Sequence, residues 1–177
     1  PSVKVRVIVA DASDGKIIFN KYPFDFSGTP SIELPPGRLR FYVIANEPAR
    51  LTNWLNMAFD ESLLAGMTIE SDDLPDNEST NGIESFTNLP AIGIIEAEMR
   101  ARPGNAAVGE VQTEPGGEWQ PVLNVGLDRV AANMSFYIRK CTPTADDSIT
   151  IRNVEVLHVP QYSGLIPAMN TGTESET

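Results

Sequence analysis

The chain has 177 residues, 41% of them apolar, which is enough to bury the core of one sizeable domain or two small ones. Its formal net charge of −11 argues against nucleic acid or an anionic membrane surface as the partner, because a phosphate backbone requires a basic footprint. The single cysteine, Cys141, excludes an intrachain disulfide, and no apolar run reaches the roughly 18 residues of a membrane-spanning helix.

The chain begins directly with a strand pattern. Residues 3–9 place four valines on one face and Lys4 and Arg6 on the other, which is typical of a strand with one buried face. We expect Lys4 and Arg6 to face solvent and to discourage accidental pairing if this strand lies near a sheet edge. Because no leader-like segment comes first, any export signal is expected upstream of Pro1.

Three more segments of the first half predict strands. Residues 16–19 follow a turn at 11–15 and predict the returning strand. The segment SIELPPG at 31–37 predicts a short strand closed by a turn. Residues 39–45 alternate most regularly, which predicts a strand that places Phe41 in the core.

One main helix is predicted at about residues 48–65. Pro48 suits the first turn of a helix because it lacks an amide hydrogen, and Gly66 suits the C-cap. Between them apolar residues recur near a 3.6-residue period, with a drift at Phe59. Trp54 lies on the apolar face of this helix, so we expect it to pack into the core.

An acidic segment, residues 70–88, follows the helix. It is rich in Ser and Asn and poor in branched apolar residues, which predicts an exposed loop suited to variable surface contacts. Its carboxylates could hold calcium, but their order lacks the pattern of a calcium-binding loop, so a solvated loop is the preferred interpretation. The carboxylates concerned are Asp72, Asp73, Asp76 and Glu78.

The second half returns to strands separated by turns that contain Pro or Gly. The last predicted strand changes phase near Arg152 and Asn153, which predicts a β-bulge there. The tail from residue 168 carries no apolar pattern and is expected to be loose. The five predicted strands are 91–99, 108–113, 121–127, 132–140 and 149–159.

Few residues point to catalysis. His158 is the only histidine, so no imidazole cluster exists for a metal, and Cys141 lacks a Cys-x-x-Cys partner. Glu96 and Glu98 share one strand face and could act as a hydrolase pair, yet such spacing is usual for a solvated face. We therefore predict a protein that is not an enzyme, with no catalytic residue, no metal and no cofactor.

The tryptophans indicate a second kind of function. A surface glycan-binding module presents an aromatic platform on which sugar rings stack. Trp119 follows a Gly-Gly turn and is the better candidate, because Trp54 is expected in the core. Glycan binding is therefore kept as the alternative to a structural role.

The stretch LPPGRLRFYVIANEP, at 34–48, joins a Pro-Pro-Gly turn to an aromatic-rich strand that precedes the predicted helix. This arrangement is similar to the fimbrillin-like proteins of Bacteroidetes, the pilus subunits and anchors of that phylum. NLPAIGIIEAEM, at 88–99, resembles the Leu/Ile-Pro-Met-x-Gly segment of these proteins, with Ala91 at the usual Met.

Two later stretches agree in order. LNVGLDRVAANMSFYI, at 123–138, resembles the Arg-x-x-Ala-Lys strand of the family, with Asn133 in place of the Lys. IRNVEVLHVPQYSGLIP, at 151–167, resembles the closing strand of its N-terminal domain, with His158 at the usual Asn. Together the four stretches extend over most of the chain.

The resemblance implies a mainly β fold, namely a transthyretin-like Greek-key β-sandwich of about seven strands with one main helix. Residues 1–167 would form this N-terminal domain and residues 168–177 a loose tail. The family resemblance further implies a structural or adhesive role in a cell-surface pilus, or fimbrium. It implies export as an outer-membrane lipoprotein, with the lipidated cysteine upstream of Pro1 and a second sandwich after this one.

The expected partners follow from the same resemblance. They are other pilus subunits, joined by exchange of a strand, and surface ligands of host or bacterial cells. Because strand exchange requires both domains, we expect the isolated chain to be monomeric.

Overall fold

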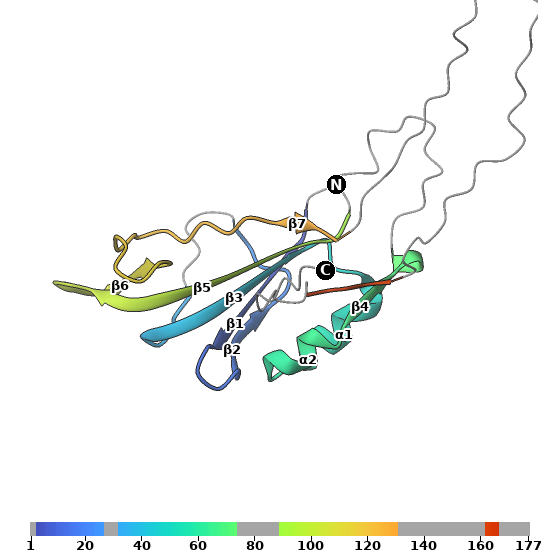
Figure 1. The fold of residues 1–177 in the computed structure, drawn as a ribbon, viewed down its shortest axis with the longest axis horizontal. Helices are drawn as coiled ribbons and strands as arrows, with labels where there is room; N and C mark the ends of the chain where they lie inside the picture. Colours follow the sequence, from blue (N-terminus) through green and yellow to red (C-terminus); the bar gives the residue numbers. More distant parts are fainter. Residues whose placement is uncertain (1–2, 27–31, 74–88, 131–161, 167–177) are drawn as a thin grey trace, which may run out of the picture.

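The computed structural model describes residues 3–26, 32–73, 89–130 and 162–166 of the chain (Figure 1). These residues are mainly β: six strands form one antiparallel sheet, two more form an antiparallel pair, and two helices pack on one face of the sheet. None of the described helices has the length and apolar content needed to cross a membrane. The elements are β1 Val5–Asp11, β2 Ile17–Lys21, β3 Gly37–Ala45, α1 Ala49–Met57, α2 Glu61–Ala65, β4 Thr68–Glu70, a 3₁₀ turn at Ser71–Asp73, β5 Ala91–Arg102, β6 Asn105–Gln112, β7 Asp128–Arg129 and β8 Tyr162–Gly164.

The strands of the sheet lie in the order β2-β1-β3-β5-β6, and β7 pairs with the first residues of β5. These positions make β3 and β5, which share a ladder of nine paired residues, the centre of the sheet. β1 lies between β2 and β3, so the first strand is not itself an edge strand but is the neighbour of the edge strand β2. The strands predicted at 3–9, 16–19, 39–45, 91–99 and 108–113 are confirmed.

The sheet buries apolar side chains on both faces. The face under α1, α2 and the β4–β8 pair is called the helix side, and Figure 1 shows these elements together on that face. The opposite face, the loop side, is covered by side chains from outside the strands, among them Phe24, Leu34 and Leu123. Buried residues include Ile8, Tyr42, Ile44, Leu51, Leu55, Leu64 and Ile92 on the helix side, and Val7, Val9, Leu39, Phe41 and Ala97 on the loop side.

Burial of both faces corrects the prediction for the first strand. Arg6, expected to face solvent, is only 1% exposed and lies on the helix side. It can be buried because Glu47, whose side chain is equally buried, neutralises its charge. Lys4, just before β1, is exposed as expected.

The single helix predicted at 48–65 is two helices separated by residues 58–60. Asp60 begins α2, and its side chain accepts a hydrogen bond from the Ser62 amide at 2.9 Å. The interruption also serves the sheet, because the Ile17 amide at the start of β2 donates to the Phe59 carbonyl at 2.9 Å. α2 ends at Gly66, as predicted.

Two predicted strands of the described part do not form. Residues 32–36 pair with no strand, and Ile32 and Leu34 instead cover the loop side of the sheet. Residues 121–127 also lie outside any strand. They belong to an excursion, residues 113–127, that connects β6 to β7. The flanking Gln112 and Asp128 pair with Glu98 and Ile92 of β5, so the excursion is much longer than the part of β5 that it passes.

Gly93 on β5 explains how the excursion crosses the sheet. A Cβ added at Gly93 would collide with the carbonyl oxygen of Gly126 and with the side chain of Val125. The backbone of the excursion therefore lies so close to the loop side of β5 that only glycine fits at position 93. Alternation in the sequence of 121–127 reflects this packing rather than strand pairing.

The mainly β prediction is confirmed, whereas the sandwich, its Greek-key topology and the domain limits stay predictions. Several predicted features lie outside the described residues. They are the strands at 132–140 and 149–159, the bulge near Arg152, Cys141, His158, the acidic segment after Asp73, and the tail at 168–177.

Candidate functional site

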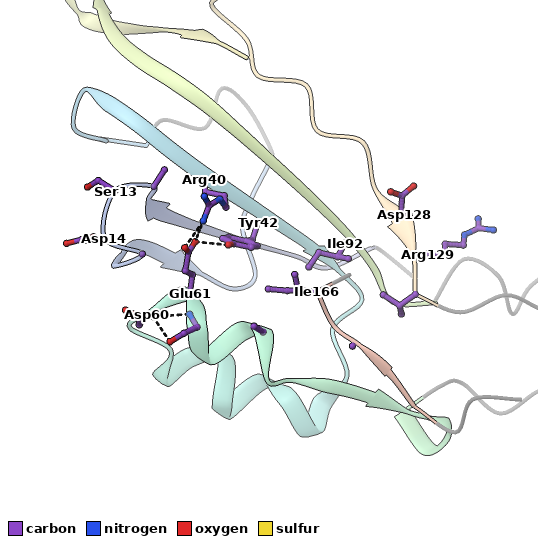
Figure 2. A pocket seen from close by; sticks show the side chains of 16 residues that line it. Ser13, Asp14, Arg40, Tyr42, Asp60, Glu61, Ile92, Asp128, Arg129 and Ile166 are labelled. Carbon is purple, nitrogen blue, oxygen red and sulfur yellow. Dashed lines mark hydrogen bonds and ion pairs between the residues drawn. The ribbon is translucent and has the colours of Figure 1, made fainter. Parts of the chain in front are cut away.

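A cleft of about 970 Å³ opens between the helix side of the sheet and helix α2. Figure 2 shows Arg40, Tyr42 and Ile92 projecting from β3 and β5 toward Glu61 of α2, with Ile166 beside them. The turn between β1 and β2 borders the cleft, and β7 and β8 contribute the rest of its wall. Five helices and strands and one turn, which come from different parts of the sequence, thus surround one space.

A polar cluster links β3 to α2 inside this cleft. Arg40 Nη1 donates to both carboxylate oxygens of Glu61 at 2.6 Å, and Arg40 Nη2 donates to Glu96 Oε2 at 2.8 Å. The Tyr42 hydroxyl donates to Glu61 Oε2 at 2.8 Å. Each charged group of the cluster therefore already has a partner of opposite charge.

The electrostatics of Arg40 and Tyr42 do not suit proton transfer by these two side chains near neutral pH. Burial, followed by the hydrogen bond to Glu61, raises the pKa of Tyr42 to about 12, so its phenol stays protonated. The hydrogen bonds to Glu61 raise the pKa of Arg40 above its ordinary value, so its guanidinium stays charged. A general acid or base works best with a pKa near the working pH. Arg40 and Tyr42 hold α2 against the sheet instead.

The turn between β1 and β2 fixes α2 from a second direction. Gly15 adopts a positive φ of 75°, and the side chain of Glu61 lies against the position where a Cβ would be. The Glu61 amide donates to the Gly15 carbonyl at 2.9 Å. Glu61 is thus held through its backbone by the turn and through its carboxylate by Arg40 and Tyr42.

Ion pairs continue along the helix side toward β6. Glu96 also pairs with Arg38, and Glu110 on β6 accepts from Arg100 and Arg102 at 3.0 Å each. Cross-strand pairs of opposite charge stabilise an antiparallel sheet. Glu96, considered with its neighbour as a hydrolase pair, is therefore engaged by arginines, and Glu98 is exposed.

Sequence reasoning missed a buried network beneath α1. Arg6 donates to Glu47 at 2.6 and 2.9 Å, to Asn20 at 2.7 Å and to Asn56 at 2.9 Å. Thr52 of α1 donates to the same Glu47 carboxylate at 2.9 Å. No local signal could reveal this network, because Arg6 and Glu47 are 41 residues apart and each looks like an ordinary surface charge.

The first residues of the acidic segment do not form a cation site. Arg50 donates to Asp73 at 3.0 and 2.5 Å, and these hydrogen bonds lower the pKa of Asp73 below its ordinary value. Asp76 and Glu78 lie outside the described residues. Within the part that the structure describes, no three His, Cys, Asp or Glu side chains are placed to hold a metal ion together.

Neither tryptophan lies where the sequence predicted. Trp119, the predicted sugar platform, is half-buried, and the Arg100 guanidinium lies 3.9 Å from the centre of its ring and occupies one face of it. Trp54, predicted to pack in the core, is 62% exposed. The break in the helix explains this, because α1 and α2 turn Leu55 and Leu64 inward and leave Trp54 outside.

Trp54 belongs to a larger surface, which we call the apolar helix patch. Its members are large apolar residues of α1, α2 and their connection, and they border a groove of about 630 Å³. Chemically, such a surface can bind an apolar partner. The apolar helix patch consists of Trp54, Met57, Phe59 and Leu63.

Comparison with known proteins adds no family to this description. No protein-family model matches the chain, and a search of curated proteins found no match. The resemblance to fimbrillin-like proteins stays a prediction that rests on the four sequence stretches alone.

Proposed function

We propose that this chain is a structural, non-enzymatic domain of a cell-surface pilus, similar to the fimbrillin-like subunits, and that it binds an extended segment of a neighbouring subunit. The observation that carries the proposal is the cleft between the sheet and α2. Arg40 and Glu61 in its wall are paired with each other, while Ala65, Val130 and Ile166 offer partly exposed apolar side chains. These apolar side chains can receive apolar residues of an extended partner.

The finer features belong to the same proposal. We propose that the described sheet is one layer of a transthyretin-like Greek-key sandwich within residues 1–167, and that the β4–β8 pair belongs to the second layer. The apolar residues on both faces of the sheet support this arrangement, because each face must be covered. Export as an outer-membrane lipoprotein rests on the sequence resemblance alone.

Filling the cleft tests the proposed contact. Ala65 lines the cleft from α2 and is exposed, so Ala65→Trp should block an incoming segment without disturbing the core. Ala49→Trp is the matched control, because Ala49 is an exposed alanine of α1 outside the cleft. Both variants should keep the thermal midpoint of the unaltered protein.

The readout is surface fibres on cells that express the full-length protein, labelled with an antibody against this domain and counted by electron microscopy. We expect labelled fibres with the unaltered protein and with Ala49→Trp, and their loss with Ala65→Trp. Equal labelling of fibres with both variants would exclude the cleft as the contact. Absence of this domain from every fibre would exclude the pilus function itself.

A glycan-binding function is the second candidate, and one observation favours it. Trp54 and Phe59 present exposed aromatic rings beside a groove. However, sugar hydroxyls require hydrogen-bonding groups, and among the described residues along this groove only Arg50, Ser62 and Thr68 carry polar side chains. Strong hits on a glycan array that disappear with Trp54→Ala would establish this alternative.

A further inference from the structure

The cleft between the sheet and α2 carries a carboxylate at each of its two ends. Figure 2 shows Asp60 at the end beside the turn between β1 and β2, and Asp128 at the opposite end, with Tyr42 between them. Asp60 immediately precedes α2, whereas Asp128 begins β7. Because Asp128 pairs with Ile92 of β5, its side chain leaves β7 on the helix side, which is the side of the cleft.

Neither carboxylate is neutralised by a basic side chain of the described residues. Asp60 accepts hydrogen bonds from the Ser62 amide at 2.9 Å and from the Ser62 hydroxyl at 2.6 Å, and both donors are uncharged. These hydrogen bonds lower the pKa of Asp60 below its ordinary value, so Asp60 is ionised at neutral pH. Asp128 is exposed and forms no hydrogen bond or ion pair with any residue that the structure describes.

The other charges at the cleft do not offset these two. Two ion pairs beside it are already complete, Arg40 with Glu61 and Lys16 with Asp14. Arg129 is the next residue of β7, so its side chain leaves the opposite face of that strand, and Figure 2 shows it pointing away from the cleft interior. The described part of the cleft thus presents two negative charges without a counter-charge to whatever enters it.

We propose that the extended segment accepted by the cleft is basic, with apolar side chains that pack on the cleft wall and a lysine or arginine at each of the two carboxylates. This inference rests on the proposed function, because it names the kind of segment that the neighbouring subunit contributes. An extended segment can present both kinds of residue, since its successive side chains point to opposite sides.

The charge of the whole chain also favours a basic segment. The chain carries a net charge of −11, so it repels other acidic chains on approach. A basic segment supplies attraction at the point of contact, and complementary charge directs it to the cleft. An acidic segment would meet the carboxylates of Asp60 and Asp128, and the repulsion would select against it.

The test is the binding of two labelled peptides to the 177-residue chain, measured by fluorescence anisotropy. Both peptides have capped ends and a length of about eight residues, which is that of an ordinary strand. One peptide alternates valine with lysine, and the other alternates valine with glutamate. We expect the lysine peptide to bind at least about tenfold more tightly than the glutamate peptide.

The cleft variant replaces both carboxylates, Asp60→Asn with Asp128→Asn. It should weaken binding of the lysine peptide about tenfold, because each exposed charge pair contributes about threefold. Asp60→Asn keeps the N-cap of α2, since an amide oxygen accepts the same hydrogen bond. Glu98→Gln with Glu118→Gln is the matched control, because it removes the same charge from exposed positions outside the cleft, and it should weaken binding about twofold at most.

Thermal midpoints should be the same for all these chains, and Asp128→Asn alone repeats the test if the double variant fails to fold. Equal binding of the two peptides, or an equal loss with the cleft variant and its control, would overturn the proposal. Absence of any binding up to about 1 mM would overturn it as well. If both peptides bind equally and Ala65→Trp abolishes both, the cleft still accepts a segment, and only its preference for basic residues is wrong. The fibre counts test the pilus function separately.

Discussion

Arg6 on β1 and Arg40 on β3 project from the same face of the same sheet, but the two regions around them are built differently. Arg6 lies under α1, is 1% exposed, and donates to Glu47, Asn20 and Asn56. Arg40 lies beside α2, its side chain is 17% exposed, and it borders the open cleft. The region under α1 buries its charged side chains completely, whereas the region beside α2 leaves its charged side chains partly exposed at the cleft.

The difference shows where this sheet gains stability and where it remains available for contact. A charge as deeply buried as that of Arg6 is tolerated only with complete pairing, so the region under α1 depends on every member of its network. The region beside α2 uses similar ion pairs at partial exposure, where each contributes less. The cleft can therefore accept a partner without dismantling the core.

Glu47→Gln should have the largest effect on stability. The substitution keeps the shape of the side chain but leaves the Arg6 charge buried without a counter-charge, which costs about 3 kcal/mol or more. Urea unfolding measures the loss in the free energy of unfolding. Joint replacement, Arg6→Met with Glu47→Leu, is the control and should lose much less. A loss below about 1 kcal/mol for Glu47→Gln would show that water reaches Arg6.

Glu61→Gln should have an intermediate effect. It weakens the hydrogen bonds from Arg40 and Tyr42 that hold α2, which should lower the free energy of unfolding by about 1–2 kcal/mol. Glu98→Gln, an exposed glutamate on the same sheet, is the control and should change little. If the two variants lose equal stability, the cluster in the cleft does not anchor α2.

Tyr42→Phe should alter the dependence of stability on alkaline pH. The pKa of Tyr42 is raised from 10 in the unfolded chain to about 12 in the fold, so its contribution is complete below pH 10 and is lost as pH rises through 12. The free energy of unfolding of the unaltered protein should fall more steeply over this interval than that of Tyr42→Phe. Parallel curves would contradict the raised pKa of Tyr42 that its burial and its hydrogen bond to Glu61 produce.

Arg102→Ala should have the smallest effect. Arg102 is about half exposed, and Arg100 continues to neutralise the buried Glu110, so the loss should be below about 1 kcal/mol. Added salt should reduce the difference further, because salt screens exposed charges. Comparison of urea midpoints at low and high salt provides the check. If Arg102→Ala lost as much free energy of unfolding as Glu61→Gln, the exposure of an ion pair would not determine its contribution to stability in this sheet.

The strands could be predicted because alternation in sequence reports a pleated surface with side chains on two faces. What alternation could not predict is the burial of both faces. Arg6 occupies a polar position in the pattern and was expected in solvent. It is buried instead, because its charge is paired with Glu47, which follows β3. A tertiary partner 41 residues away overrides the local signal.

The helical region shows the same limit in a different form. The irregularity of the apolar period at Phe59 lies where α1 ends and α2 has not yet begun. It did not indicate which face of each helix would be directed toward the core. Because α2 restarts with Asp60 as its cap, Leu64 rather than Leu63 reaches the core, and Trp54 stays outside. The cleft could not be predicted from sequence, since its wall combines five elements that meet only in the folded sheet.

Photo-crosslinking at the cleft tests the central claim most directly. A photoreactive phenylalanine analogue at Ala65 of the full-length protein, illuminated on cells, reports any chain that enters the cleft. We expect a ladder of crosslinked subunits from Ala65 and none from the same analogue at Ala49, which lies on α1 outside the cleft. Absence of crosslinks at Ala65, or an equal ladder from Ala49, would contradict the assignment of the cleft as the site of subunit association.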